Sequence, residues 1–439
     1  RTPQGRTRGR RRDRAGTGAR VSPFATTPAA PLHARARRGI GALCHARRGT
    51  LRTFAFLALV ASLWFGFLEL RGLYFPDEGR YAEIPREMLA SGDWVTPRLD
   101  GFPYFEKPPL QYWVTATIFA VAGEDEWTAR AGPALLGFLA VLAVWGTATR
   151  VHSRRAGWMA AALLGGSAGY FLANQFVTLD VTLTALVTMA LCAFVIAQQE
   201  ATSAAGRRWW MYAAWVLCGL AFLAKGAIAI VLPGLAIAVY VALTRDIRLL
   251  GRLHAGAGLL LVAVIVAPWL LAAERRNPGF LQFFIITEHW ERFLEPSHQR
   301  TGPVWYFIPV GAAFLMPWLP ALARDLLERK RTRSAVHTFD SARFAGCWAA
   351  AVVVFFSLSS SKLPPYILPA LTGVALACAP SLARRWQRTV RITAWTLVAS
   401  GAAGAAIALP AARWIKVDAL RDAYVANAGW MLAGLTAFV

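Results

Sequence analysis

The sequence predicts an all-α polytopic membrane protein with about 12 transmembrane helices, and three observations lead to this fold class. Apolar residue types make up 56% of the 439 residues, and the mean hydropathy is +0.42. Charged residues make up 16%, well below the roughly 25% of an average soluble domain. Apolar runs long enough to cross a bilayer recur from Leu51 to Val439. These features exclude a soluble enzyme, a disordered chain and a disulfide-stabilised scaffold.

Residues 1–50 form an Arg-rich segment that we expect to be disordered, because it has few apolar residues to bury. Residues 1–52 hold 14 arginines and a single acid, Asp13, so more than half of the formal net charge of +23 lies there. Charge confined to such a tail gives no reason to expect a nucleic-acid partner. Two interpretations stay open: a basic cytoplasmic tail, or an upstream extension with no role of its own. We favour the second, because apolar patterning begins only near Leu51.

Residues 51–439 are expected to form the membrane domain. A transmembrane helix needs about 20 apolar residues, within a range of roughly 17–25. Leu110–Ala122 is too short for this, so we expect an interfacial or re-entrant helix there. The expected spans are 52–70, 133–149, 157–174, 181–199, 209–224, 226–244, 253–273, 303–322, 344–360, 364–380, 392–411 and an incomplete one from 428.

The charges of the loops predict the orientation of these spans. With the N-terminus inside, the cytoplasmic loops are 150–156, 200–208, 245–252, 323–343 and 381–391, and they hold 18 Lys and Arg against five acids. This is the positive-inside bias of membrane proteins. The large polar loops 71–132 and 274–302 then face outward, as do the short turns that carry Asp180, Lys225 and Lys362. Ionisable residues near spans are costly and usually functional or paired, so we expect an outward-facing site.

The first outer loop carries the densest group of charged residues. Asp77 and Glu78 follow Pro76 directly after the first span, and Arg80 comes three residues after Asp77. Adjacent carboxylates in a confined site suit acid–base chemistry or metal binding. The alternative is a helix N-terminus, where Pro followed by two acids is favourable first-turn chemistry. Taken alone, these residues favour the helix N-terminus.

The sequence YFEKPP closes this loop, and its prolines hold Glu106 and Lys107 out of a helix. Neighbours on an extended chain point to opposite sides, so the two side chains are expected to face different parts of a site. A lysine at a membrane surface is a compact point charge suited to phosphate. An ordinary lysine whose ammonium reaches the interface is an equally good explanation of Lys107 by itself.

The remaining candidates lie on the same expected face. Lys225 stands in an apolar neighbourhood and must find an anion elsewhere in the chain, while Arg292 either grips a phosphate or pairs with Glu288. Carboxylates gathered at one interface beside several cations suit an anionic lipid headgroup better than an ion that crosses the membrane. A transporter should instead show paired halves with broken helices near the midplane, and the sequence has no such repeat.

Taken in order, these motifs resemble a known family. The strings are PDEGRYAEIPREMLASGDWVTPRLDGFPYFEKPPLQYW, then an Asp that starts a span, LAKG and SSSKLPPYILP. From about residue 52 to the end the chain resembles the bacterial dolichyl-phosphate-mannose-type glycosyltransferases of the C superfamily, and most closely their lipid A aminoarabinose transferases. Members carry a periplasmic domain after the last span. The sequence stops inside an apolar run at Val439, so we expect this chain to lack that domain.

The resemblance implies roles for individual residues. The expected catalytic residues are Asp77, Glu78 and Asp180, and those expected to bind the donor phosphate are Lys107, Arg292, Lys225 and Arg80. The substrate cavity is expected to include Tyr81, Tyr104, Glu106, Lys362 and Tyr366. Some relatives use a divalent cation, for which Glu106 and His289 are the first ligands to test.

The resemblance also implies an activity. The chain is expected to transfer 4-amino-4-deoxy-L-arabinose from undecaprenyl phosphate to a lipid A phosphate at the periplasmic face of the bacterial inner membrane, where membrane lipids surround it. One alternative is a related transferase that moves mannose or another sugar to protein or glycan, and another is a lipid or solute transporter. The sequence alone fixes neither the sugar nor the acceptor.

Overall fold

The computed structural model describes residues 58, 60–74, 76–291, 301–328 and 339–411. The chain divides into a unit of residues 1–60 and a unit of residues 61–439, and the fold described below is that of the second unit. Residues 1–57, 59, 75, 292–300, 329–338 and 412–439 lie outside the described residues. The expected span that begins at 428 is among them.

The first outer loop folds into two short helices and a hairpin. Helix α2 (Asp77–Ser91) leads to strands β1 (Arg98–Leu99) and β2 (Phe102–Pro103), which pair antiparallel. The turn between them, Asp100-Gly101, has positive φ at both residues (52° and 77°), as a tight two-residue hairpin turn of this hand requires. The segment 104–109 is not helical, as its prolines predict, and helix α3 (Leu110–Ala122) begins directly after it.

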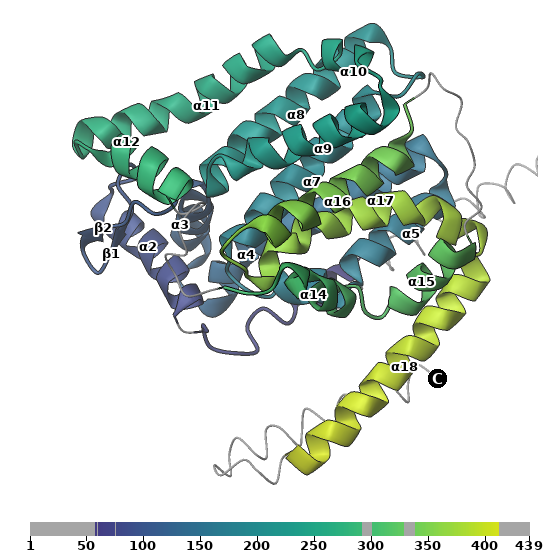
Figure 1. The fold of residues 1–439 in the computed structure, drawn as a ribbon. Helices are drawn as coiled ribbons and strands as arrows, with labels where there is room; N and C mark the ends of the chain where they lie inside the picture. The colour runs from purple at the N-terminus through teal and green to yellow at the C-terminus, as the bar shows by residue number, and fades with distance from the viewer. Residues whose placement is uncertain (1–57, 59, 75, 292–300, 329–338, 412–439) are drawn as a thin grey trace, which may run out of the picture. The chain divides into compact units, whose positions relative to one another are not determined.

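The rest of the described chain is a bundle of helices (Figure 1). Its elements are α4 (Glu126–Val151), α5 (Arg154–Gly165), α6 (Ala168–Ala173), α7 (Leu179–Ala197), α8 (Ala204–Lys225), α9 (Ile228–Thr244), α10 (Arg248–Gly251), α11 (Ala255–Arg276), α12 (Phe280–Gln282), the π-helix η1 (Phe283–Glu291), the 3₁₀ turn η2 (Val304–Tyr306), α14 (Phe307–Phe314), α15 (Leu319–Glu328), α16 (Ser341–Leu358), the 3₁₀ turn η3 (Pro364–Ile367), α17 (Leu368–Arg384) and α18 (Trp386–Ala411).

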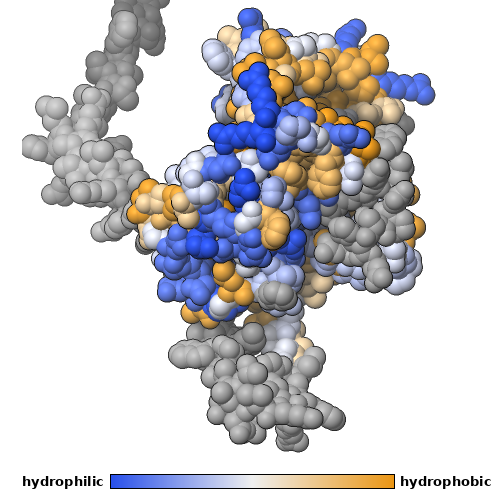
Figure 2. Space-filling model, turned by 90° about the vertical axis from the view of Figure 1, so that its left-hand side faces the viewer, coloured by the Kyte–Doolittle hydropathy of each residue, from blue (hydrophilic) through white to orange (hydrophobic). Residues whose placement is uncertain are grey.

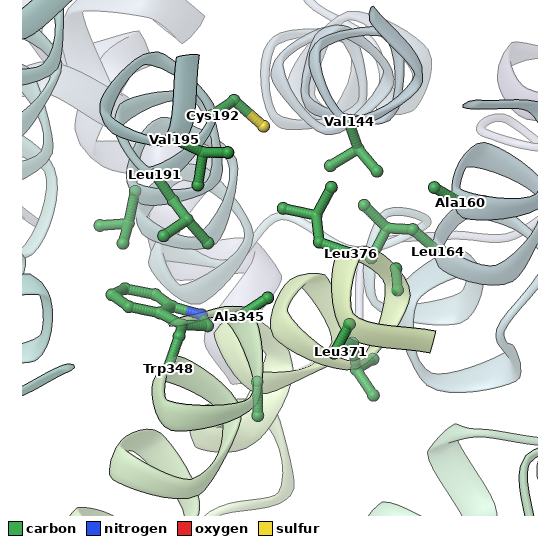
Figure 3. Packing of buried hydrophobic residues seen from close by; sticks show 14 of the residues in the cluster. Val144, Ala160, Leu164, Leu191, Cys192, Val195, Ala345, Trp348, Leu371 and Leu376 are labelled. Carbon is green, nitrogen blue, oxygen red and sulfur yellow. The ribbon is translucent and has the colours of Figure 1, made fainter. Parts of the chain in front are cut away.

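Helix α7 is the buried centre of this bundle, in contact with α4, α8 and α17. Figure 3 shows apolar side chains of α4, α5, α7, α16 and α17 meeting there, among them Leu191, Cys192, Trp348 and Leu376. Helices α16 and α17 approach closely at Gly373, where a Cβ atom would lie 2.6 Å from a backbone oxygen. Small residues at helix interfaces give membrane bundles this kind of packing.

The described residues contain five helices that are long and apolar enough to cross a membrane, or six if one bent pair counts as a span. Two expected spans are wrong as single helices. The span 157–174 is interrupted between α5 and α6, where the chain turns at Gly166 and Ser167. The span 303–322 bends by 108° between α14 and α15. Pro317 lies at that break and has no backbone N–H to continue a helix.

One end of the bundle carries most of the expected site residues. Helices α4 and α7 begin there, helices α8 and α11 end there, and α2, α3 and the hairpin lie beside them at the left of Figure 1. Figure 2 looks onto this end and shows hydrophilic residues gathered over it, with apolar patches around them.

Candidate active site

An ion pair joins two of the expected site residues at the ends of two central helices. Asp180 lies in the first turn of α7 and accepts a short hydrogen bond from Lys225, the last residue of α8. A carboxylate at a helix N-terminus and an ammonium at a C-terminus both complement the helix dipoles. The ring of Tyr366 lies 4.7 Å from the Lys225 ammonium, close enough for a cation–π contact. Three expected site residues therefore meet here.

A second ion pair joins the first outer loop to η1. Lys107 Nζ donates to Glu288 Oε2 at 2.8 Å and to the backbone oxygen of Glu106 at 2.7 Å. Both charged side chains are largely buried, at 13% and 9% exposed. Phe105, which directly precedes Glu106, packs edge-on against Phe280 at the start of α12. This contact holds the two segments beside each other.

A chain of hydrogen bonds links Asp77 to Glu106. Arg80 donates to Asp77 Oδ1 at 2.5 Å and to the Tyr104 hydroxyl at 3.3 Å, and Tyr104 donates to Glu106 Oε2 at 3.0 Å. Burial raises the pKa of Tyr104 to about 12, so the phenol keeps its proton at neutral pH. Asp77 is 52% exposed, which leaves its carboxylate accessible to a substrate.

Tyr81 lies within electrostatic reach of both Asp77 and Asp180. Burial raises its pKa well above the usual range, and the charges of Tyr104, Asp180 and Asp77 add to this effect. Arg80 also lies over its ring, 5.5 Å from the centroid. Tyr81 therefore contacts Arg80 of the network of Asp77, Arg80, Tyr104 and Glu106, and the charge of Asp180 also acts on it.

Glu78 is held in the protein interior, away from this exposed group. Its side chain is 1% exposed and accepts hydrogen bonds from Arg71 (2.5 Å) and Arg130 (2.9 and 3.1 Å), and from the backbone N–H groups of Tyr74 and Val177. Burial alone would raise the pKa of Glu78, but these bonds outweigh it and lower the pKa to about 2. The helix N-terminus considered for Asp77 and Glu78 is present as the start of α2. The catalytic role expected for Glu78 stays a prediction.

Lys362, expected to line the substrate cavity, has backbone partners in the structure. Its ammonium is buried and donates to the backbone oxygens of Ser357 and Ser359 at 2.9 and 2.7 Å. These carbonyls lie at the C-terminal end of α16, so Lys362 caps that helix. Arg292 lies outside the described residues, as does the side chain of His289, which follows Glu288 in η1.

The two expected metal ligands therefore remain a prediction. Among the described residues, a group of three carboxylates within ligand distance of one another is formed by Glu83, Glu87 and Asp100, and Glu106 is not part of it. Glu106 offers one carboxylate, of which one oxygen already accepts from Tyr104.

Sequence reasoning missed the cations that hold Glu78. Arg130 is fully buried in the first turns of α4 and also donates to the backbone oxygens of Arg71 and Gly72. The available signal was an arginine at the start of an apolar run, since such a residue needs an anion nearby. The sequence carries no signal for which of the many loop carboxylates that anion is.

Comparison with known proteins agrees with this architecture. Residues 49–284 match the family model of dolichyl-phosphate-mannose-protein mannosyltransferase. The chain is 32% identical to the undecaprenyl phosphate-alpha-4-amino-4-deoxy-L-arabinose arabinosyl transferases of Erwinia tasmaniensis and Aeromonas salmonicida, over 81% and 84% of its own length. It covers 66% and 69% of those relatives, so it spans about two thirds of their length.

A solved structure supports the same relationship. The crystal structure of ArnT from Cupriavidus metallidurans bound to undecaprenyl phosphate superposes with a TM-score of 0.76 at 36% identity, over 88% of this chain and 70% of that one. The fold and these similarities define an integral membrane protein of the glycosyltransferase class. The chain belongs to the dolichyl-phosphate-mannose-protein mannosyltransferase family, and its curated relatives are the aminoarabinose transferases.

Proposed function

We propose that the protein transfers 4-amino-4-deoxy-L-arabinose from undecaprenyl phosphate to a phosphate of lipid A. The names of the curated relatives and the undecaprenyl phosphate bound by the Cupriavidus metallidurans protein support this donor. The observation that carries the proposal is the pairing of Lys107 with Glu288 beside the network of Asp77, Arg80, Tyr104 and Glu106, at one end of an apolar bundle. A lipid-borne phosphate reaches such a site from the membrane.

The chemistry of the transfer explains why cations are needed. As the bond between sugar and phosphate breaks, negative charge develops on the leaving phosphate and the sugar becomes oxocarbenium-like. Lys107 is a preorganised point charge for that phosphate, and Lys225, Arg80 and Arg292 are proposed as further phosphate ligands. A charge that acts where new charge develops stabilises the transition state more than the bound substrate. Glu106 and His289 are the residues that would hold a divalent cation, and no step of this mechanism depends on one.

Asp77 and Asp180 are proposed as the carboxylates that face the sugar. A phosphate acceptor with a second pKa of about 6 is already an anion at neutral pH and needs no general base. Asp77 then stabilises positive charge on the sugar or orients its amino group. A hydroxyl acceptor would instead need Asp77 as a general base. Tyr81, Tyr104 and Tyr366 supply the walls and hydrogen-bond donors around the sugar.

Substitution of Asp77 separates charge from geometry. With lipid A as acceptor, Asp77→Ala should lower turnover by roughly 100- to 1,000-fold, because a fixed charge near the reacting sugar is lost. Asp77→Asn should lose less, because the amide keeps the hydrogen bond from Arg80. Turnover is measured with purified enzyme and lipid-linked donor. Near-wild-type turnover of both variants would remove Asp77 from the mechanism.

We also propose that the site faces the periplasm from the bacterial inner membrane, in a bundle of about 12 spans. The loop charges support this orientation. The length of helix α4 supports a helix that crosses the membrane. Arg130, which binds Glu78, and Val151 at the other end are 21 residues apart, and at about 1.5 Å per residue this is roughly 32 Å. The hydrocarbon core of a bilayer is about 30 Å thick. The segments beyond the two ends of α4 would therefore lie at opposite membrane faces.

Mass spectrometry of lipid A tests donor and acceptor together. Cells that express the full-length gene should gain lipid A species heavier by one pentosamine on a phosphate, and cells that express the Asp77→Ala variant should not. Lipid A that stays unchanged while a hexose appears on protein would instead establish the related mannosyltransferase activity. A modified phosphate without the pentosamine mass would contradict the proposed sugar.

A further inference from the structure

A second group of charged side chains lies at the opposite end of the bundle from the active site. Arg155 of α5, Arg384 and Arg385 at the end of α17, and Arg388 of α18 line an open cavity with a volume of about 740 Å³. Trp158, Trp386 and Gln387 complete its walls. In Figure 1 the helices that carry these residues meet at the right, whereas α2, β1 and β2 lie at the left. We refer to this group as the arginine cavity.

Positive charge in the arginine cavity exceeds the negative charge near it. Glu328 pairs with Arg385 and Arg388, and it also binds Arg324 outside the cavity. Arg155 and Arg384 form no ion pair with any acid in the described part of the chain. Within the described residues, four guanidinium groups thus share one carboxylate, which leaves room for an anion.

The helix ends at the arginine cavity also carry more positive than negative charge. Helices α5 and α18 both begin there, and neither has an acid in its first turn. Arg155 and Arg388 occupy those first turns instead. A cation at a helix N-terminus opposes the helix dipole, and the N–H groups there favour an anion, although Ser153 already accepts from one of them in α5. Both the side chains and the backbone therefore present positive potential to the cavity.

The surroundings of the arginine cavity indicate a lipid rather than a free anion. Tryptophan side chains are enriched where a membrane protein crosses the interface between lipid and water, and Trp158 and Trp386 both line the arginine cavity. Beyond them α18 exposes Val390, Trp395 and Leu397, an apolar surface that acyl chains can cover. Basic pockets between helices on the cytoplasmic side of membrane proteins suit phosphate headgroups.

We propose that the arginine cavity binds the headgroup phosphate of an anionic phospholipid in the leaflet opposite the active site. Arg155, Arg384 and Arg388 contact the phosphate, the two tryptophans flank the glycerol region, and the acyl chains lie along α18. This lipid is separate from donor and acceptor, since roughly 32 Å of α4 lies between Arg130, which binds Glu78, and Val151, which shortly precedes Arg155 of the cavity. The inference depends on membrane embedding alone and not on which sugar is transferred.

The test measures lipid binding by the purified chain. Phosphatidylglycerol or phosphatidylcholine is titrated into detergent micelles that contain the protein, and bound lipid is counted by native mass spectrometry while thermal unfolding is followed in parallel. Phosphatidylglycerol should bind and raise the unfolding midpoint, and phosphatidylcholine should not. The variant Arg155→Gln/Arg384→Gln should need at least about tenfold more phosphatidylglycerol for half-saturation.

A matched control variant removes two positive charges, as the test variant does. Arg154 adjoins Arg155 but does not line the cavity, and Arg208 lies near the start of α8 on the same expected membrane side, so Arg154→Gln/Arg208→Gln should bind like wild type. Equal loss in both double variants would show attraction to basic charge in general and overturn the site. Displacement of the lipid by millimolar inorganic phosphate would overturn the choice of a lipid. Arg155 and Arg384 are both exposed, so the double variant should still fold. Arg155→Gln alone should weaken binding about fivefold.

Discussion

Replacement of Lys107 by Met should lower turnover with the lipid-linked donor by roughly 100- to 1,000-fold, the range seen when one preorganised oxyanion ligand is removed. Methionine keeps the length of the side chain and removes the charge. The loss should appear mainly in kcat, because the ammonium acts on charge that develops as the phosphate leaves. Steady-state kinetics with purified enzyme and varied donor concentration measure both parameters.

Arg86→Met is the matched control for this substitution. Arg86 is an exposed cation of the same outer loop. It pairs with Glu83, which is not among the residues expected to bind the donor. Its loss should change turnover by less than about twofold, within the small effects of surface ion pairs. If Lys107→Met raised KM while kcat stayed unchanged, the lysine would stabilise the bound donor and the transition state equally. The proposed action on the transition state would then be wrong.

Glu78→Gln should destabilise the protein by about 3–5 kcal/mol, the cost of removing one partner from a buried ion pair. Arg130 is 1% exposed and would keep its charge with no carboxylate beside it. Thermal or denaturant unfolding in detergent measures the loss. The double variant Glu78→Gln/Arg130→Met should lose less than the sum of the two single variants, because the residues contact each other. Additive losses would mean that the pair is not coupled.

The same carboxylate predicts how stability depends on pH. Its pKa is about 2 in the folded protein and about 4.5 in an ordinary environment, so the folded state favours the ionised form. This contribution is fully present above about pH 4.5 and is lost as the pH falls toward 2. The wild type should therefore become less stable over that window, and Glu78→Gln should lack this part of the decline.

Apolar run length predicted most of the helices, and helix breaks explain where it failed. The runs at 181–199 and 209–224 correspond to α7 and α8, because a continuous apolar stretch must bury its backbone in helical hydrogen bonds. The run at 157–174 is also free of charged residues, yet it breaks at Gly166 and Ser167. Composition does not register such a break, because serine and glycine disturb a hydropathy average very little.

The membership of the site stays a prediction, and the ion pairs among the expected residues could not be predicted from the sequence. Charged residues beside spans pointed to Asp77, Lys107 and Lys225, and the structure brings each of the three to a partner. Which carboxylate meets which cation depends on contacts across as many as 181 residues, such as that between Lys107 and Glu288. No local pattern encodes such contacts. Glu78 looked equivalent to its neighbour Asp77, and only the turn of α2 separates a buried carboxylate from an exposed one.

The pairing of Lys107 with Glu288 and of Lys225 with Asp180 has a consequence for how tightly a donor can bind. If the donor phosphate binds these ammonium groups as proposed, it competes with a carboxylate that already neutralises each of them. Donor affinity would then be a difference between two ion-pair energies, which would keep affinity modest and release of the spent carrier easy. It also spares the resting protein an uncompensated ammonium at the edge of the hydrocarbon between one turnover and the next.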